Sequence, residues 1–503
     1  MSDMLKRALN ARVSDVLPSP TPLDPAPILS ARLHVSVLLK REDLTPIFSF
    51  KIRGAYSKIA LLTEAERAAG VIAASAGNHA QGVAYAAARL GLRARIVMPQ
   101  TTPSIKTNAV RALGATVELA GDDYSAAAEH CRHVTTETRM TPIAAYDDLD
   151  LIAGQATIGL EILHQAPRAL GVIFVPIGGG GLAAGIASVV KELRPDIRVI
   201  GVQAEDSDAM ARSIAAKRRV ALAHVGIFAD GVAVKEVGSH TFDICRWALD
   251  DVVIVSTDEI CAAIQDAFED TRSVLEPAGA LSIAGLKRAV ASGSLTGGTA
   301  VAIASGANMN FLRLGYVTER AELGEHREAI LAVTIPERPG SFLEFCRIVG
   351  QKSVTEFNYR LASRAEAHIF VGLEVSGRDE AAAIARRLES AGYPTIDLTD
   401  SELAKTHVRY MVGGRAAEAV DEIVFSFEFP ERPGALLQFL STLGSRWNIS
   451  LFHYRNHGSA FGRVLCGFEA TPDERDELLA RLASLGFDHS EQSGDPAVRL
   501  FLE

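Results

Sequence analysis

The chain has 503 residues, of which 48% are hydrophobic and 22% charged, and its formal net charge is −10. That length is too great for one hydrophobic core, so we expect roughly two to four domains, and the dispersed, mildly acidic charge argues against nucleic acid or an anionic membrane as the main partner. The five cysteines are scattered without a Cys-x-x-Cys pair, which favours reduced thiols in a cytoplasmic protein and argues against a disulfide framework or a structural metal site.

The N-terminal segment is not expected to be a secretory signal. Residues 1–15 lack the long apolar stretch of a secretory signal, and residues 1–30, rich in Pro, Ala and Ser, are expected to wrap over a domain surface. Residues 169–190 are uncharged and long enough to cross a bilayer. However, Pro176 and the four glycines at 178–181 interrupt them, so two buried elements joined by a tight loop explain this stretch better than a membrane span.

Short apolar runs alternate with helical stretches over the first two thirds of the chain. The runs are almost continuously apolar, which is typical of parallel strands covered by helices on both faces. We therefore expect a large α/β unit up to residue 325, ending in an exposed, charge-rich connecting helix over 316–327. The expected strands are 71–74, 94–98, 115–119, 172–177, 199–203 and 300–304, and the expected helices are 78–90, 103–113 and 182–193.

The last third contains an internal repeat. Residues 335–360 and 429–455 both contain a P-E-R-P-G turn, an amphipathic helix and a strand that ends in Tyr-Arg. Two copies are too few for a solenoid. They predict two compact α+β modules packed as a pair, over 326–418 and 419–503.

Lys51 is the first residue that suggests chemistry. It lies in the segment I-F-S-F-K-I-R-G-A over residues 47–55, between apolar and aromatic side chains. An amine in such surroundings loses water, which lowers its pKa and frees it for Schiff-base formation. The alternative is a lysine whose aliphatic stem packs while its amine reaches solvent.

A second motif, Ser75-Ala76-Gly77-Asn78-His79, directly follows a predicted strand and opens a predicted helix. Backbone N–H groups at a helix N-terminus bind carboxylates and phosphates. The alternative is a simple N-cap by Ser75 or Asn78.

Two further motifs also follow predicted strands. The four glycines 178–181, before Leu182, allow a phosphate to approach several backbone N–H groups, and the alternative is a close strand–helix crossing. Ser305-Gly306-Ala307-Asn308 ends another strand. Since ligands of open α/β sheets bind at the carboxyl ends of strands, these motifs together predict a phosphate-bearing ligand beside a lysine.

In this order, the motifs S-F-K-I-R-G-A, S-A-G-N-H-A-Q-G, G-G-G-G-L and S-G-A-N resemble those of fold-type II pyridoxal-phosphate enzymes, and the similarity is greatest to the biosynthetic threonine dehydratases (threonine ammonia-lyases). The resemblance runs from about residue 15 to the C-terminus. It implies a catalytic unit with parallel-rich sheets followed by two ferredoxin-like, ACT-like modules. It further implies a cytoplasmic homotetramer that converts L-threonine, and secondarily L-serine, to a 2-oxoacid and ammonia.

The same resemblance implies roles for individual residues. Lys51 binds pyridoxal 5′-phosphate as an imine and moves protons at Cα of the substrate, Asn78 hydrogen-bonds the ring hydroxyl, and Ser305 faces the pyridine nitrogen. A neutral serine does not hold a proton on that nitrogen as an aspartate does, which favours elimination over transamination. The phosphate is cradled by Gly178, Gly179, Gly180, Gly181 and Leu182, and the substrate carboxylate by Ser75, Ala76, Gly77 and His79.

One segment departs from the family pattern. The family often has His-Pro-Phe-Asp-Asp-Pro where this chain has Ala-Ala-Tyr-Asp-Asp-Leu over residues 144–149. Because this loop lies near the active-site entrance in such enzymes, the departure bears on substrate preference. The alternatives to a threonine dehydratase are a serine/threonine dehydratase of broader range, a serine racemase and a non-catalytic amino-acid sensor.

The repeated modules are expected to bind amino-acid effectors. Neither copy holds a nucleophile–base pair or a metal-ligand cluster, but Tyr359-Arg360 and Tyr454-Arg455 end corresponding strands. An arginine pairs with a ligand carboxylate, and an aromatic ring covers an aliphatic side chain. The alternative is that all four are packing and surface residues. The resemblance implies isoleucine as inhibitor and valine as its opponent.

Overall fold

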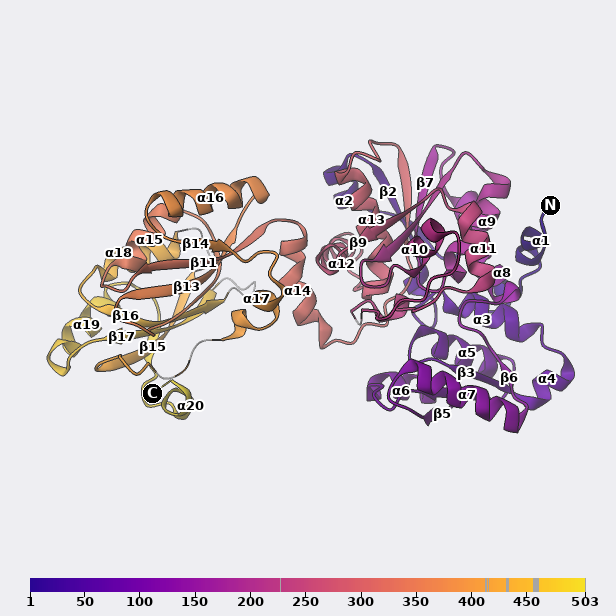
Figure 1. The fold of residues 1–503 in the computed structure, drawn as a ribbon, viewed down its shortest axis with the longest axis horizontal. Coiled ribbons are helices and arrows are strands. Elements are labelled where there is room, and N and C mark those ends of the chain that lie inside the picture. Colours follow the sequence, from indigo (N-terminus) through magenta and orange to yellow (C-terminus); the bar gives the residue numbers. More distant parts are fainter. Residues whose placement is uncertain (227, 412–413, 415, 431–433, 456–460, 503) are drawn as a thin grey trace. The chain divides into compact units, whose positions relative to one another are not determined.

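The computed structural model forms two compact units, Met1–Gly324 and Glu325–Glu503 (Figure 1). Within the described part of the chain, no helix has the length and apolar character that a membrane crossing needs. All five cysteines are buried thiols outside any disulfide. The residues that the structure describes are 1–226, 228–411, 414, 416–430, 434–455 and 461–502.

A six-stranded sheet forms the centre of the first unit, with strand order β1-β2-β10-β7-β8-β9. All neighbours pair in parallel except β1 and β2. Successive side chains of a strand point to opposite faces, so Val172 and Phe174 enter one core while Ile173 and Val175 enter another. The strands are β1 (Leu23–Pro25), β2 (Ser36–Arg41), β7 (Leu170–Pro176), β8 (Arg198–Ala204), β9 (Asp251–Val255) and β10 (Thr299–Ala304).

Helices cover both faces of this sheet. On one face lie α2, α12 and α13, and on the other α8, α9 and α11 (Figure 1). The parallel sheet with helices on both faces confirms the α/β prediction. The bounds are α1 (Asp3–Leu9), α2 (Pro27–Leu33), α8 (Leu149–Gln165), α9 (Gly181–Leu193), α10 (Ala209–Ala216), α11 (Ser239–Ala248), α12 (Thr257–Thr271) and α13 (Pro277–Ala291).

A smaller four-stranded parallel sheet, of order β5-β4-β3-β6, lies within the same unit. Residues of α3, α5 and α6 form a core on one of its faces, and residues of α7 form one on the other. The strands are β3 (Val71–Ala74), β4 (Ala94–Met98), β5 (Thr116–Leu119) and β6 (Thr141–Pro142), and the helices are α3 (Lys51–Ala60), α4 (Glu64–Ala69), α5 (Asn78–Arg89), α6 (Ser104–Ala112) and α7 (Tyr124–Thr138).

The connecting helix differs from its prediction. It is α14 (Arg313–Gly324), which begins and ends about one turn earlier than the expected 316–327. It is not fully exposed, because Val317 and Ala321 are buried in the core that α12 and α13 share. The many charged residues in its sequence led to the prediction of an exposed helix, although its apolar residues Val317 and Ala321 lie on one buried face.

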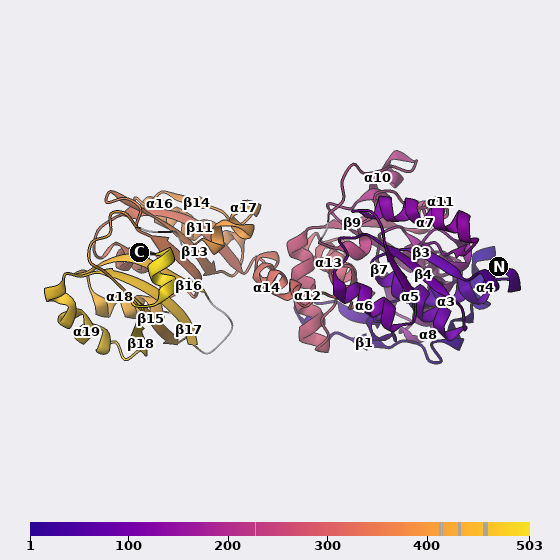
Figure 2. The ribbon, with the colours of Figure 1, turned by 90° about the horizontal axis from the view of Figure 1, so that it is seen from below.

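The second unit contains one antiparallel sheet of eight strands, ordered β14-β11-β13-β12-β16-β17-β15-β18 (Figure 2). The two repeats each supply four strands, and β12 pairs with β16 so that Phe357 lies opposite Tyr454. The predicted pairing of two modules is therefore a continuous sheet. The strands are β11 (Glu328–Pro336), β12 (Val354–Arg360), β13 (Glu366–Glu374), β14 (Thr395–Asp397), β15 (Glu422–Pro430), β16 (Asn448–Arg455), β17 (Phe461–Glu469) and β18 (His489–Glu491).

Helices of both repeats share one hydrophobic core over this sheet. Rings of Phe357 and Phe452 meet across the β12–β16 junction with centroids 5.2 Å apart. The helices are α15 (Ser341–Val349), α16 (Arg378–Ser390), α17 (Glu402–Thr406), α18 (Ala435–Leu443), α19 (Arg475–Ala483) and α20 (Pro496–Phe501). Glu431, Arg432 and Pro433 of the second P-E-R-P-G turn lie outside the described residues.

Candidate active site

The backbone segment over residues 45–50, called the strap below, holds Lys51 against the end of β10. The backbone N–H of Phe50 donates to the carbonyl of Ser305 at 3.2 Å, and Ala307 N–H donates to the carbonyl of Phe48 at 2.9 Å. The Thr45 hydroxyl accepts the Ser49 N–H at 2.9 Å, which closes the strap into a turn. Lys51 then begins α3, so its position is fixed from both sides.

The Lys51 side chain is partly buried among protein atoms. Its Nζ donates to the carbonyl of Ala145 at 2.8 Å and lies 5.3 Å from the centre of the Phe50 ring. Burial lowers the pKa of Lys51 to about 8, against the opposing attraction of the Glu276 carboxylate. About a tenth of the amine is therefore unprotonated at pH 7, and the pKa is lowered in the direction that the sequence motif predicted.

The loop from Ser75 to Gly77 connects β3 to α5 and leaves open space beside Gly77, where an added Cβ would meet nothing within 4 Å. His79, in the first turn of α5, is buried. Its Nε2 lies 3.0 Å from the carbonyl of Ile143, which accepts a hydrogen from it. Burial lowers the pKa of His79 to about 3, so the ring is neutral, and its buried Nδ1 has no hydrogen-bond partner among the described residues. The loop is therefore an uncharged opening at a helix N-terminus.

Asn78 is the first residue of α5 and lies against two other segments. Its Nδ2 donates to Glu276 Oε1, and its Oδ1 accepts a hydrogen bond of 2.7 Å from Asn308. Glu276 precedes α13, and burial raises the pKa of its carboxyl to about 7. Neither Glu276 nor Asn308 was predicted from the sequence to have a role of its own. The signal at Glu276 is a carboxylate directly before a proline at a helix start.

The glycines that follow β7 form a tight turn into α9. Gly180 has a φ of +99° and caps the helix, which is a conformation that favours glycine. A Cβ on Gly179 would lie 2.2 Å from the Tyr146 ring, and the Thr241 hydroxyl donates to the Gly179 carbonyl at 2.7 Å. The Leu182 side chain is buried in the core, so only its backbone N–H is available to a ligand.

Ser305 is buried beside α13. Its hydroxyl donates to the Ala278 carbonyl at 3.2 Å, and its N–H donates to the Gly279 carbonyl at 3.3 Å. A Cβ on Gly279 would lie 2.0 Å from the Gly306 carbonyl oxygen, so close packing of α13 on the end of β10 needs this glycine.

The loop over 144–149 joins these parts together. The Ala145 carbonyl accepts a hydrogen bond from the Lys51 amine. The Tyr146 ring packs on Gly179, and its hydroxyl donates a hydrogen bond to the Glu236 carbonyl at 3.1 Å. Asp147 accepts hydrogen bonds from the first N–H groups of α11. The sequence related this loop to substrate preference, and in the structure the loop contacts both Lys51 and the glycine turn.

These residues fit pyridoxal phosphate by their chemistry. A buried amine with a depressed pKa forms Schiff bases, and a run of glycines at the N-terminus of α9 offers backbone N–H groups to a phosphate. Asn78 and Ser305 supply neutral polar groups. The arrangement can hold a phosphorylated aldehyde at Lys51 with an amino-acid carboxylate at the α5 N-terminus.

The predicted effector residues lie on matching strands of the second unit. The Tyr359 hydroxyl donates to Glu337 Oε2 at 2.6 Å, and burial together with this bond raises the pKa of Tyr359. The Arg360 guanidinium pairs with Glu422, an intramolecular carboxylate. Tyr454 is buried in the shared core, and Arg455 lies 5.0 Å from the Tyr410 ring.

Comparison with known proteins gives two family matches. Residues 16–306 match the family described as pyridoxal-phosphate dependent enzyme. Residues 319–408 and 413–502 each match the family described as the C-terminal regulatory domain of threonine dehydratase.

Individual relatives agree with these matches. The biosynthetic L-threonine dehydratase of Burkholderia multivorans is 56% identical over 99% of both chains. A solved threonine deaminase from Solanum lycopersicum, isoform 2 in its processed form, has a TM-score of 0.62 and 44% identity, and covers 64% of this chain and 88% of its own. A solved threonine deaminase from the organism abbreviated T.th. has a TM-score of 0.57 and 38% identity, and covers 61% of this chain and 99% of its own.

Proposed function

The chain belongs to the pyridoxal-phosphate-dependent enzymes, and from its likeness to biosynthetic threonine dehydratases along the whole chain we infer that it dehydrates and deaminates L-threonine to 2-oxobutanoate and ammonia, the entry step of isoleucine biosynthesis. The observation that carries this inference is that hydrogen bonds link the segments of Lys51, Asn78 and Ser305 into one site. They come from segments far apart in the sequence and are linked by the strap, by Asn308 and by Glu276.

We propose that Lys51 and Ser305 act in catalysis and that the cofactor is held by these two, by Asn78, and by the backbone of residues 178–182. When bound, pyridoxal phosphate supplies an electron sink that makes the Cα proton of an amino acid acidic. The Lys51 amine, once the amino group of the substrate has displaced it from the cofactor, would accept that proton, since its pKa of about 8 leaves it partly unprotonated. The Cβ hydroxyl would take up one proton and leave as water, so that the Cα hydrogen and the Cβ hydroxyl together make up the water lost, and later addition of water would release the 2-oxoacid and ammonia.

The substrate carboxylate is assigned to the loop of Ser75, Ala76 and Gly77, with His79 behind it. The first N–H groups of α5 favour an anion there. The neutral His79 ring adds no charge, and its bond to the Ile143 carbonyl ties the start of α5 to the segment that leads into the 144–149 loop.

The substrate proposal is tested by measuring 2-oxoacid release from L-threonine and from L-serine. A threonine dehydratase converts threonine with the higher kcat/KM. Preference for serine, or racemisation of serine without 2-oxoacid, would instead favour a serine dehydratase or a serine racemase. Bound cofactor with no turnover of either would favour the non-catalytic sensor.

We propose that the second unit binds isoleucine as inhibitor and valine as its opponent, at Tyr359 and Tyr454 with Arg360 and Arg455 nearby. The two tyrosines occupy corresponding positions in the two repeats, which supports two related sites. Glu422 already neutralises Arg360, so carboxylate binding at that site needs this ion pair to rearrange. Isothermal titration with each amino acid, on wild type and on Tyr359→Leu and Tyr454→Leu, tests the assignment.

We also propose a cytoplasmic homotetramer built from chains with a catalytic domain over 1–325 and modules over 326–418 and 419–503. Five buried thiols outside any disulfide suit a reducing compartment. Light scattering of the purified protein measures the oligomer, and limited proteolysis maps the boundaries.

A further inference from the structure

A chain of hydrogen bonds joins four separate segments beside Lys51. Asn308 Nδ2 donates to the Ile47 carbonyl at 2.8 Å and to Asn78 Oδ1 at 2.7 Å, and Asn78 Nδ2 donates to Glu276 Oε1. The Glu276 backbone N–H in turn donates to the Gly306 carbonyl at 3.1 Å. We call Asn308, Asn78 and Glu276 the amide relay.

The relay has only one self-consistent direction. The Ile47 carbonyl can only accept, so it requires the NH2 end of Asn308. The second hydrogen of that NH2 group then meets Asn78, which must present its oxygen. Asn78 consequently turns its own NH2 end to Glu276, whose carboxylate oxygen accepts. The orientation of Asn78 therefore follows from a backbone carbonyl that cannot change its role.

This orientation leaves Asn78 one donor that is unused among the described residues. Its amide oxygen is occupied by Asn308 and one Nδ2 hydrogen by Glu276, so a single Nδ2 hydrogen remains. The close approach of Glu276 depends on Gly306, where a Cβ would lie 2.4 Å from Glu276 Oε1 and 3.3 Å from Asn78 Nδ2. Both ends of the relay are thus built into the backbone of the site.

We propose that Asn308 and Glu276 are positioning residues which hold Asn78 as a hydrogen-bond donor for the ring hydroxyl of pyridoxal phosphate and so stabilise the ionised form of that hydroxyl. This inference rests on the proposed cofactor site. The positioning acts through hydrogen-bond direction rather than through the charge of Glu276, and that distinction makes it testable.

Three variants separate the direction of the relay from charge and from packing. Asn308→Asp keeps the shape but replaces the donor by an oxygen, which reverses the demand on Asn78. Glu276→Gln removes the charge but still offers Oε1 to Asn78, whereas Glu276→Leu removes both charge and acceptor at similar volume. Asn310→Asp is the matched control, because the Asn310 side chain accepts a hydrogen bond from the Leu312 N–H that aspartate retains.

The measurements are the dissociation constant of pyridoxal phosphate from each protein and the absorbance spectrum of the bound cofactor. We expect Asn308→Asp and Glu276→Leu to bind the cofactor about tenfold more weakly, as the loss of one buried hydrogen bond implies. In both, the visible band should decrease and the near-ultraviolet band of the un-ionised hydroxyl should increase. Asn310→Asp should keep the wild-type spectrum and bind within about threefold of wild type, whereas Glu276→Gln, which keeps the acceptor, should bind the cofactor more tightly and retain more of the visible band than Glu276→Leu.

Equal effects of Glu276→Gln and Glu276→Leu would overturn the proposal, because charge or volume would then explain both. A normal spectrum in a folded Asn308→Asp protein would also overturn it, with circular dichroism as the check on folding. If Asn308→Asp does not fold, the two Glu276 variants decide alone. Wild-type protein that binds no pyridoxal phosphate would overturn the proposed function and the relay with it, whereas normal wild-type binding with unaffected variants overturns the relay only.

Discussion

At the scale of single residues, the site depends on the protonation of one amine. Lys51 loses water by burial, donates to the Ala145 carbonyl and faces the ring of Phe50. Glu276 attracts its proton and His79, being neutral, does not repel it. The balance leaves Lys51 with a pKa of about 8, which suits both attack on an aldehyde and transfer of a proton.

Replacing Lys51 by alanine tests the assignment directly. Lys51→Ala removes the covalent anchor and the base together, so turnover of threonine should fall by more than about 10⁴-fold, and the visible absorbance of the purified protein should disappear. Lys58→Ala is the control on the same helix, since Lys58 pairs with Asp148 and Asp150 and should keep the absorbance. Near-normal activity in Lys51→Ala would refute the proposed mechanism.

The pKa of Lys51 also predicts how fast the cofactor-free protein takes up pyridoxal phosphate. Only the unprotonated amine attacks a carbonyl group, so the rate should rise with pH up to about 8 and then level off. A lysine with the ordinary value of 10.5 would give a rate that still rises above pH 9. Stopped-flow absorbance between about pH 6 and 10 measures the midpoint.

Sequence motifs predicted the residues that follow strand ends, but not the contacts between them. Lys51, Asn78 and Ser305 were recognisable because each stands in a motif beside an apolar run. The roles of Tyr146 and Glu276 were not, because they arise from contacts with residues far away in the chain. A motif describes local backbone, whereas a hydrogen bond across the site depends on how the elements pack.

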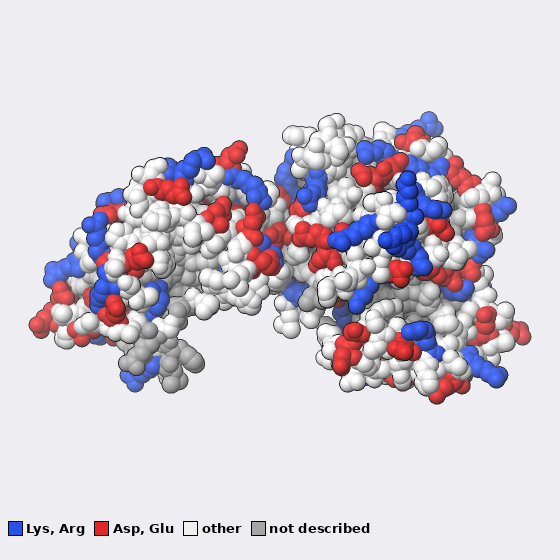
Figure 3. Space-filling model, in the orientation of Figure 1, with Lys and Arg blue, Asp and Glu red and all other residues white. Residues whose placement is uncertain are grey.

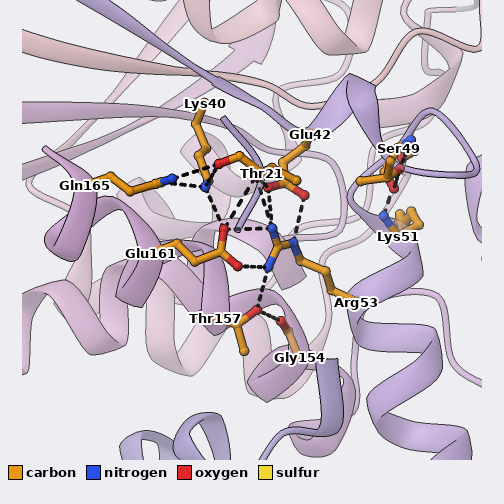
Figure 4. Close-up of polar contacts among 11 residues, drawn as sticks. Thr21, Lys40, Glu42, Ser49, Lys51, Arg53, Gly154, Thr157, Glu161 and Gln165 are labelled. Carbon is orange, nitrogen blue, oxygen red and sulfur yellow. Dashed lines mark hydrogen bonds and ion pairs between the residues drawn. The ribbon is translucent and has the colours of Figure 1, made fainter. Parts of the chain in front are cut away.

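At the scale of elements, a buried ionic network positions α3, the helix that Lys51 begins (Figure 4). Arg53 is fully buried and pairs with Glu42 and with Glu161 on α8. Lys40 on β2 donates to Glu161 at 2.6 Å. Because buried charges must stay paired, the network allows one register of α3 against β2 and α8. Sequence periodicity gave the bounds of the expected strands and helices to within about two residues, except for α14, which lies about one turn earlier, and it did not reveal this network.

Removing Arg53 should therefore destabilise the first unit strongly. Arg53→Met keeps the length of the side chain but removes the cation that pairs with buried Glu42 and leaves Glu161 with Lys40, which costs roughly 3–5 kcal/mol for a broken buried pair. Arg194→Met is the control, since the Arg194–Asp196 pair is exposed and is worth at most about 1 kcal/mol. Urea unfolding followed by circular dichroism measures both, and equal losses would show that the network does not stabilise the fold.

At the scale of the whole molecule, chemistry and sensing are assigned to separate units. The catalytic residues proposed here all lie before Gly324, and the four effector residues all lie after it. Acidic and basic side chains are interspersed on the visible face of each unit, as their dispersal in the sequence predicted (Figure 3). The repeat predicted two modules, but it did not predict that they join into one sheet through β12 and β16. The pairing of two edge strands depends on both copies and has no signal in the sequence of either copy alone.

Separate units predict that the first works without the second. A chain ending at Gly324 keeps α14 and its buried residues Val317 and Ala321, so the catalytic core stays covered. The match to the solved T.th. threonine deaminase covers 99% of that chain but only 61% of this one. A chain with the fold of the first unit therefore exists without a second unit. The shortened chain should therefore bind pyridoxal phosphate and release 2-oxobutanoate from threonine.

What the shortened chain should lose is its response to isoleucine. Coupling between an effector site and an active site typically amounts to about 1–3 kcal/mol, or roughly 5- to 150-fold in affinity. If that coupling runs through the proposed effector sites around Tyr359 and Tyr454, isoleucine should leave the kinetics of the shortened chain unchanged while it inhibits the full chain. The full chain with Tyr359→Leu and Tyr454→Leu is the matched control, since it keeps both units. If isoleucine inhibits the shortened chain as strongly as the full one, the effector site lies within residues 1–324.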